Sequence, residues 1–170
     1  MTSSDAAVEI TGVDPTAAGE LVDLWVPLAR GQREYGSHLR AEANRTRVRE
    51  LLARYAANDR LLVARSEADS ADLETDTVGF VMFRTRSDRY EVDSSRGLVE
   101  NLYVVPDCRG SGIGSALLSA AERRLGERGV ETVSLEAMAA NEDARRFYRR
   151  HGYESHRIEF EKSLDGDGDG

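Results

Sequence analysis

The sequence of 170 residues has a single cysteine, only three prolines and no apolar run long enough to cross a membrane. The lone cysteine, Cys108, cannot form an internal disulfide, and the CxxC and HExxH spacings of common metal sites are absent. The first residues have neither a basic start nor an apolar core, so they do not resemble a secretory signal. We therefore expect a protein of a reducing cytoplasm, with no membrane partner and no metal site.

Lysine is also nearly absent. Lys162 is the only one, and 31 acidic residues exceed 23 basic ones, for a formal net charge of −8. Because an acidic surface repels the phosphates of nucleic acids, we expect no nucleic-acid partner. Lysine depletion with an acidic excess suits a protein from a high-salt environment, and a biased base composition of the gene explains it equally well. The sequence leaves both explanations open.

The length suits one domain, which we place at residues 6–164, between tails at 1–5 and 165–170 that we expect to be disordered. Apolar periodicity and turn residues predict six strands and four helices within it. We expect the strands at residues 8–13, 61–64, 78–83, 98–105, 132–135 and 157–160, and the helices at residues 14–28, 44–55, 113–125 and 141–150. Antiparallel-looking strands followed by a strand–turn–helix–strand unit predict a single α/β (α+β) domain.

The strongest local signal is a glycine-rich turn between a strand and a helix. Gly110, Gly112 and Gly114 stand at alternate positions, which lets the backbone pass close to a ligand. The start of the next helix offers free N–H groups to an anion, most naturally a phosphate, and Arg109 adds a positive charge. A tight turn without a ligand is the alternative, although such a turn needs one glycine rather than three.

Two common phosphate-binding motifs do not fit this turn. A P-loop requires a Lys followed by Ser or Thr after its glycines, and no Lys stands here. The dinucleotide fingerprint G-x-G-x-x-G fails at its third glycine, where Ser115 stands. The pattern R-x-x-G-x-G, by contrast, fits completely, at Arg109, Gly112 and Gly114.

With its flanks, this stretch resembles the acetyl-CoA-binding core of the GCN5-related N-acetyltransferase (GNAT) family. Leu102-Tyr-Val-Val-Pro is similar to the family's fourth strand, Arg109 to Gly114 to its pyrophosphate loop, and Asn141 to Tyr148 to its asparagine–tyrosine helix. The resemblance implies a mixed, mostly antiparallel sheet of six to seven strands, flanked by about four helices, with the fourth and fifth strands splayed apart. It implies acetyl-CoA as co-substrate, an amine acceptor as the second partner, and a fold in which a homodimer is plausible.

In such enzymes the pantetheine arm of the cofactor lies between the splayed strands, and loop amides hold the pyrophosphate. The residues that the resemblance assigns to cofactor binding are Leu102, Tyr103, Val104, Arg109, Gly110, Ser111, Gly112, Ile113, Gly114, Ser115 and Asn141. The three strand residues also suit an ordinary core strand, and Asn141 suits a helix N-cap. These roles are compatible, because a strand binds through its backbone while its side chains pack.

The resemblance makes Tyr148 the acid that protonates the departing thiolate of CoA. A phenol with a pKa of about 10 holds its proton at neutral pH and can deliver it to such a leaving group. The alternative is a core aromatic side chain beside Phe147.

Two carboxylates are candidates for the base or amine-binding group, Glu100 on the fourth strand and Glu136 at the end of the fifth. Strand alternation places Glu100 in one row with the apolar residues Leu98, Leu102 and Val104. Such surroundings suit a base, so we favour Glu100 over Glu136. The alternative for both is a solvated charge near a strand end.

The sequence thus predicts an acetyl-CoA-dependent N-acetyltransferase, in which a primary amine of a small molecule or peptide attacks the thioester directly in a ternary complex. A strand amide near Val104 would meet the oxygen that becomes negative. The alternative is a non-catalytic acyl-CoA-binding regulatory domain on the same fold. A nucleotide-dependent dehydrogenase survives only if the glycine pattern misleads, and the identity of the acceptor stays open.

Overall fold

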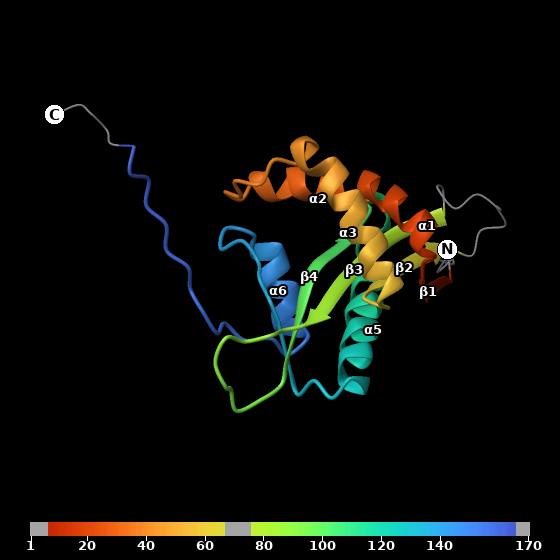
Figure 1. Cartoon of the computed structure of the whole chain (residues 1–170). Helices are drawn as coiled ribbons and strands as arrows, with labels where there is room; N and C mark the ends of the chain where they lie inside the picture. Colours follow the sequence, from red (N-terminus) through yellow and green to blue (C-terminus); the bar gives the residue numbers. More distant parts are fainter. Residues whose placement is uncertain (1–6, 67–75, 166–170) are drawn as a thin grey trace.

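The computed structural model describes residues 7–66 and 76–165, and within them five strands form one sheet in the order β1-β2-β3-β4-β5 (Figure 1). The strands are β1 (Val8–Gly12), β2 (Leu61–Ser66), β3 (Thr77–Thr85), β4 (Arg96–Val104) and β5 (Thr132–Leu135). The first four pair antiparallel, and β5 joins β4 in parallel. The expected mixed, mostly antiparallel sheet is confirmed.

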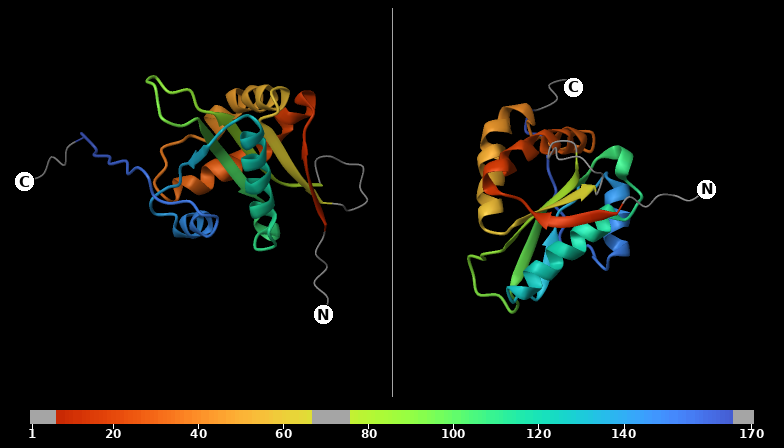
Figure 2. Two further views of the ribbon diagram at one scale, coloured as in Figure 1. Left: turned by 90° about the horizontal axis from the view of Figure 1, so that it is seen from below. Right: turned by 90° about the vertical axis from the view of Figure 1, so that its right-hand side faces the viewer.

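Helices cover both faces of the sheet, as the two views of Figure 2 show. One face carries α1 (Pro15–Ala18), α2 (Val22–Arg33) and α3 (Arg45–Ala57), and the other carries α5 (Ile113–Glu127) and α6 (Glu142–Arg150). Asp14 begins α1 by accepting a hydrogen bond from the Thr16 amide at 2.8 Å. A 3-10 turn then separates α1 from α2, where the sequence predicted one continuous helix.

Two apolar cores result, one on each face. Strand β3 shows why, because Phe80 and Met82 point into the core below α1–α3 while Val81 and Phe83 point into the core below α5. All four side chains are essentially inaccessible to solvent. A strand buried on both faces fixes its register strongly, so the neighbouring β4 is held firmly along its length.

A β-bulge interrupts β4 at Glu100. Val99 pairs with Phe83 and Asn101 pairs with Met82, so Glu100 is an extra residue with no partner on β3. The bulge turns the Glu100 side chain toward α3, where it meets Tyr55.

The predicted row of Glu100 with Leu102 and Val104 is therefore wrong. Leu102 and Val104 pack on the α5 side of the sheet, together with Val99, whereas Tyr103 joins the opposite core. The extra residue shifts the alternation by one position, which strict strand periodicity does not anticipate.

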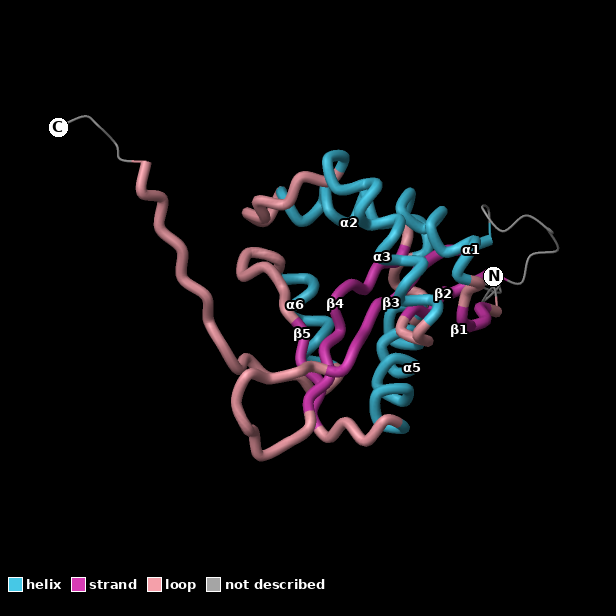
Figure 3. The backbone as a smooth tube through the Cα atoms, viewed as in Figure 1, coloured by secondary structure: helices cyan, strands magenta, loops and turns pink. Residues whose placement is uncertain are grey.

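The sheet opens beside the bulge. Strand β5 pairs with β4 only as far as Val99 and Leu135, while β4 continues to Val104. The predicted splay of the fourth and fifth strands is confirmed, and it lies next to Glu100. Figure 3 shows the two strands in magenta parting toward α6.

The expected sheet of six to seven strands is larger than the five strands in the described residues. The predicted strand at 157–160 is wrong for this single chain, because those residues form no ladder with any described strand. The expected tails lie outside the described residues, apart from Asp165.

Candidate active site

The glycine loop that follows β4 requires its glycines for conformation. Gly110 and Gly112 have φ angles of +81° and +86°, in the left-handed region that other residues rarely adopt. Gly114 lies in the first turn of α5, where an added Cβ would stand 3.4 Å from the Phe147 ring of α6. The loop therefore requires glycine for its backbone conformation at Gly110 and Gly112, whereas a Cβ at Gly114 would only reach ordinary contact with α6.

This loop presents a group of free backbone donors. Among the described residues, no backbone carbonyl accepts a hydrogen bond from the N–H groups of residues 110–115, and the first such bond runs from Ala116 to Gly112 at 3.0 Å. The positive end of the α5 dipole coincides with these donors. The arrangement suits an anion such as a pyrophosphate.

Arg109 lies across the end of β4. Its Nε donates to the Val104 carbonyl at 2.8 Å, and its guanidinium carbon lies 5.4 Å from the centre of the Tyr103 ring. The side chain is thereby held beside the loop, in contact with two other residues that the sequence analysis assigns to cofactor binding. Ser111 in turn donates to the Cys108 carbonyl at 2.7 Å, which tightens the turn.

The part of β4 beyond the bulge has an open edge on its β5 side. Residues 101–104 pair with β3 but not with β5, because the β4–β5 pairing ends at Val99. Leu102, Tyr103 and Val104 thus lie where an extended ligand can pair with backbone groups, directly before the glycine loop. Their assignment as cofactor-binding residues remains a prediction.

Asn141 and Tyr148 both belong to the last helix, α6, where Asn141 is the N-cap and Tyr148 lies two turns further along. The Asn141 side chain accepts a hydrogen bond from the Ala144 amide at 3.1 Å, so the predicted N-cap is confirmed. Tyr148 packs with its ring centre 5.2 Å from that of Phe147 and 6.0 Å from that of Tyr153. Burial raises the pKa of the Tyr148 phenol, so the hydroxyl holds its proton at neutral pH.

Glu100 is held by two side chains that the sequence analysis did not assign to the site. Its carboxylate accepts from the Tyr55 hydroxyl of α3 and, at 2.8 Å, from Arg84 Nε of β3. Burial, and then the bond to Glu100, raises the pKa of Tyr55 to about 12. A tyrosine on the apolar face of a helix needs a polar partner for its hydroxyl, and this requirement was the available signal.

Glu136 differs from Glu100 in its surroundings. It is exposed, and it makes no hydrogen bond or ion pair with the described residues. Because Val99 and Leu135 form the last β4–β5 pair, Glu100 and Glu136 are each the first residue past the point where the strands part. The structure thus brings both candidates to one end of the gap, and only Glu100 is fixed there.

A second contact that sequence reasoning missed joins α5 to α6. Nδ1 of His151 lies 2.8 Å from the Phe147 carbonyl, and Nε2 lies 2.9 Å from Oγ of Ser115. Since a carbonyl only accepts, Nδ1 carries the proton of the first contact, and Nε2 lies within hydrogen-bond distance of the serine hydroxyl. The sequence suggests only the contact with the helix end, because Ser115 is 36 residues away.

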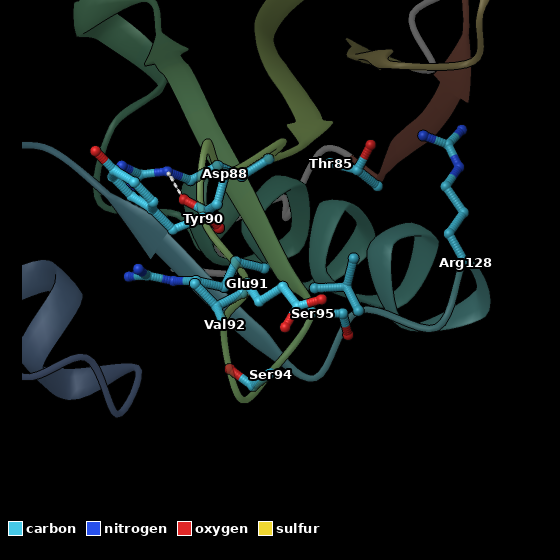
Figure 4. Close-up of a pocket in the computed structure, with 11 residues that line it drawn as sticks. Thr85, Asp88, Tyr90, Glu91, Val92, Ser94, Ser95 and Arg128 are labelled. Atoms are coloured by element: carbon cyan, nitrogen blue, oxygen red, sulfur yellow. Dashed lines mark ion pairs between the residues drawn. The ribbon is translucent and has the colours of Figure 1, made fainter.

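A cavity lies at the other end of β4. It has a volume of about 340 Å³ and lies between the β3–β4 hairpin and the end of α5, with Tyr90, Ser94 and Arg128 in its lining (Figure 4). The hairpin precedes β4 and the glycine loop follows it, so the cavity and the loop are separated by the length of a nine-residue strand, about 27 Å. The cavity is therefore far from the glycine loop, although Thr85 in its lining directly follows Arg84, the partner of Glu100.

The described residues contain neither a candidate metal site nor a helix that could span a membrane. No group of three or more His, Cys, Asp or Glu side chains gathers there as a candidate metal site. None of the helices in these parts of the chain has the length and apolar character that crossing a membrane requires.

Known N-acetyltransferases are similar to this chain in sequence and in fold. The chain is 40% identical over 68 residues to the aminoalkylphosphonate N-acetyltransferase of Salmonella typhimurium, a match that covers 40% of this chain and 44% of that enzyme. The match thus spans less than half of the curated relative.

Solved structures extend the likeness over the whole fold. A GCN5-related N-acetyltransferase from Ralstonia eutropha has a TM-score of 0.69 at 22% identity, with 94% of this chain and all of the other covered. The aminoglycoside N-acetyltransferase AAC(6')-Iy in complex with CoA has a TM-score of 0.68 at 17% identity, with 96% and 99% covered. The model of the acetyltransferase (GNAT) family matches residues 20–153, which is most of the chain. The chain therefore belongs to the acetyltransferase (GNAT) family, whose enzymes use acetyl-CoA as co-substrate.

Proposed function

We propose that this chain is an acetyl-CoA-dependent N-acetyltransferase that transfers the acetyl group directly to a primary amine in a ternary complex. One observation carries the proposal. The family match coincides with a gap between β4 and β5 that leads straight into the loop at 110–115, from whose six N–H groups no described backbone carbonyl accepts a hydrogen bond. An extended thioester ligand ending in a pyrophosphate has the shape and charge that such a gap and loop can bind.

Cofactor binding is assigned mainly to backbone groups. The edge of β4 at Leu102, Tyr103 and Val104 would pair with the pantetheine arm, and the amides of residues 110–115 would bind the pyrophosphate. Arg109 adds charge at the loop. Asn141 caps α6 and, in this proposal, also contacts the ligand.

Glu100 is proposed to receive the acceptor amine. An aliphatic amine has a pKa of about 10.4 and must lose a proton before it can attack the thioester carbonyl. Tyr55 and Arg84 occupy two positions on the Glu100 carboxylate, and a carboxylate has about four lone-pair directions, so it can still accept from a substrate. Glu136, exposed at the end of β5, is the second candidate for this role.

Tyr148 is proposed to protonate the leaving group. As the new C–N bond forms, negative charge develops on the carbonyl oxygen, which would accept a hydrogen bond from a strand amide near Val104. As the C–S bond then breaks, the negative charge moves to the sulfur. A thiol has a pKa of about 8.5, and that of buried Tyr148 lies above its ordinary value. Tyr148 therefore enters the step protonated and donates to the sulfur as the charge develops.

The first test is a calorimetric titration of the full chain with acetyl-CoA, with NADH as control, at low salt and at molar salt. We expect saturable binding of acetyl-CoA and no binding of NADH. No binding at either salt would overturn the cofactor assignment and every site residue that depends on it. Binding of NADH would favour a dehydrogenase instead.

Catalysis is tested by thiol release with a panel of amines. Because related proteins are named for an aminoalkylphosphonate and an aminoglycoside, small amines of these two classes form the first panel. We expect Tyr148→Phe to lower kcat on the order of 100-fold with little change in the Kd of acetyl-CoA. Tyr153→Phe, which removes the neighbouring hydroxyl bonded to Glu122, is the control. Binding without any turnover across the panel would favour a regulatory acyl-CoA-binding domain.

A further inference from the structure

Charged side chains form a row across neighbouring strands at the level where β4 and β5 part. We define this charged row as Arg60, Arg84, Glu100 and Glu136. Arg60 directly precedes β2, and its carbonyl accepts a hydrogen bond from the Phe83 amide of β3 at 3.0 Å. Arg84 of β3 and Glu100 of β4 form an ion pair, and Glu136 directly follows β5. Because these strands are neighbours in the order β2-β3-β4-β5, the row changes from positive to negative across the sheet (Figure 3).

Arg84 is the inner cation of the charged row, and its contacts use only part of its hydrogen-bonding capacity. Nε donates to Glu100 at 2.8 Å, Nη1 reaches the Thr85 carbonyl at the long distance of 3.4 Å, and the group also lies beside Tyr55. A guanidinium has five N–H donors in a planar fork, which suits two parallel hydrogen bonds to an anion. Since 36% of the Arg84 side chain is exposed, the solvent-facing edge of the fork is accessible to a ligand.

Arg60 adds a second positive charge, and it forms no ion pair with the described residues. Its charge acts on the same centre. Burial, and then the bond to Glu100, raises the pKa of Tyr55 to about 12, while Arg84 and Arg60 oppose this rise. Tyr55 therefore stays neutral at pH 7 and balances neither arginine. Because Glu100 already balances Arg84, the charge of Arg60 leaves the α3 side of the charged row with a positive excess.

We infer that the acceptor carries an anionic group besides its amine, and that Arg84 is the residue that selects this group, with Arg60 as the second cation. The inference rests on the proposed function, because it takes Glu100 as the group that receives the amine. The amine end then lies toward the two glutamates of the charged row and the anionic end toward its two arginines, so that each charge of the substrate meets its opposite. A diamine would instead place a second positive charge against the arginines, which disfavours it.

The spacing of the strands limits the length of such an acceptor. Arg84 and Glu100 lie on neighbouring strands, and neighbouring strands are about 4.8 Å apart. A chain of about two or three carbon atoms between the amine and the anionic group spans a similar distance, since a C–C bond measures about 1.5 Å. We therefore expect short amino acids whose amine and anionic group stand at opposite ends of the molecule.

The test compares acetylation rates of amines matched in length, at saturating acetyl-CoA. The matched pairs are 3-aminopropanoate with propylamine and 4-aminobutanoate with butylamine, and 1,3-diaminopropane is the cationic counterpart. For at least one pair, we expect the anionic amine to exceed its neutral match about tenfold in kcat/KM, with the diamine poorest. The preference should decrease with added salt, because Arg84 is partly exposed.

Variants of the arginines show which residue carries the preference. Arg84→Gln should lower the ratio of kcat/KM for the anionic amine to that for its neutral match about tenfold, and Arg60→Gln should lower it about threefold. Arg86→Gln removes a charge that pairs with Asp88 in the β3–β4 hairpin, and as the control it should keep the ratio. An equal loss for both amines in Arg84→Gln would mean that Arg84 only positions Glu100, and would overturn the inference.

Circular dichroism shows whether each variant is folded. If Arg84→Gln does not fold, Arg84→Lys keeps the charge but not the planar fork, and it should lose part of the preference. Neutral amines that react as fast as their anionic matches, or a preferred diamine, would overturn the inference. Absence of transfer to both anionic amines by a chain that binds acetyl-CoA would overturn it as well. The proposed function fails differently, because acetyl-CoA then does not bind, or no amine of any class is acetylated.

Discussion

The two sides of the gap between β4 and β5 are built in different ways. The side assigned to the cofactor uses backbone groups from one short stretch, the end of β4 and the loop at 109–115. The side assigned to the acceptor centres on a side chain, Glu100, whose partners Tyr55 and Arg84 are 45 and 16 residues away in the sequence.

The two sides of the gap therefore differ in how far they depend on the rest of the chain. Backbone donors and glycine conformations depend on a local sequence, so that side can stay constant while the rest of the chain changes. Side-chain partners from α3 and β3 depend on how those elements pack over the bulge. Substitutions on one side should therefore affect one substrate and leave the binding of the other unchanged.

The largest effect is expected from Glu100→Gln, which should lower kcat/KM for the amine on the order of 100-fold. The amide keeps the shape of the side chain but neither accepts the proton of the amine nor balances the charge of Arg84. The Kd of acetyl-CoA, measured by calorimetry, should stay within about twofold, because the loop donors are untouched.

Glu136→Gln is the matched control for this experiment. Glu136 lies at the same end of the gap but has no partner among the described residues that fixes its position. We expect a much smaller loss than for Glu100→Gln. A larger loss at Glu136 would move the amine-binding role from β4 to β5.

A smaller effect, confined to the cofactor side, is expected from Gly112→Ala. An added Cβ meets no atom within 4 Å, but the φ of +86° is strained for any residue with a Cβ, at about 1–2 kcal/mol. If the loop relaxes from this conformation, its donors separate, and acetyl-CoA should bind about 10-fold more weakly.

Gly126→Ala is the matched control for the loop variant. Gly126 lies inside α5, its added Cβ also meets no atom within 4 Å, and its φ is not positive. Alanine there favours the helix, so the Kd of acetyl-CoA should not change. Equal weakening in both variants would contradict a specific role of the loop conformation.

The contrast between local backbone features and contacts from distant elements also explains which features could be predicted from the sequence. The strand at 132–135, the start of a helix at Ile113 and the cap at Asn141 follow from local patterns, and the structure confirms them. The bulge at Glu100 depends on the register of two strands, and the segment at 157–160 lacks a neighbour in a single chain. Features that depend on the packing of a second element have no complete signal in one stretch of sequence.

The smallest effect concerns the acceptor side, through the Tyr55 hydroxyl. Its pKa is raised to about 12, by burial first and then by its bond to Glu100, whereas an unfolded tyrosine titrates at about 10. Below pH 10 both states hold the proton and the contribution of Tyr55 to stability is complete. Between pH 10 and 12 the unfolded state releases its proton first, so this contribution is lost as the pH rises.

Chemical unfolding at a series of alkaline pH values checks this. Tyr55→Phe should cost on the order of 1 kcal/mol at pH 8, through the lost hydrogen bond to Glu100, and should show a shallower loss of stability above pH 10. Because the other partner of Glu100, Arg84, stays in place, acetyl-CoA binding should be unchanged. Identical pH slopes for the variant and the wild type would mean that folding does not raise the pKa of Tyr55, and an unchanged stability at pH 8 would mean that its hydrogen bond to Glu100 contributes nothing.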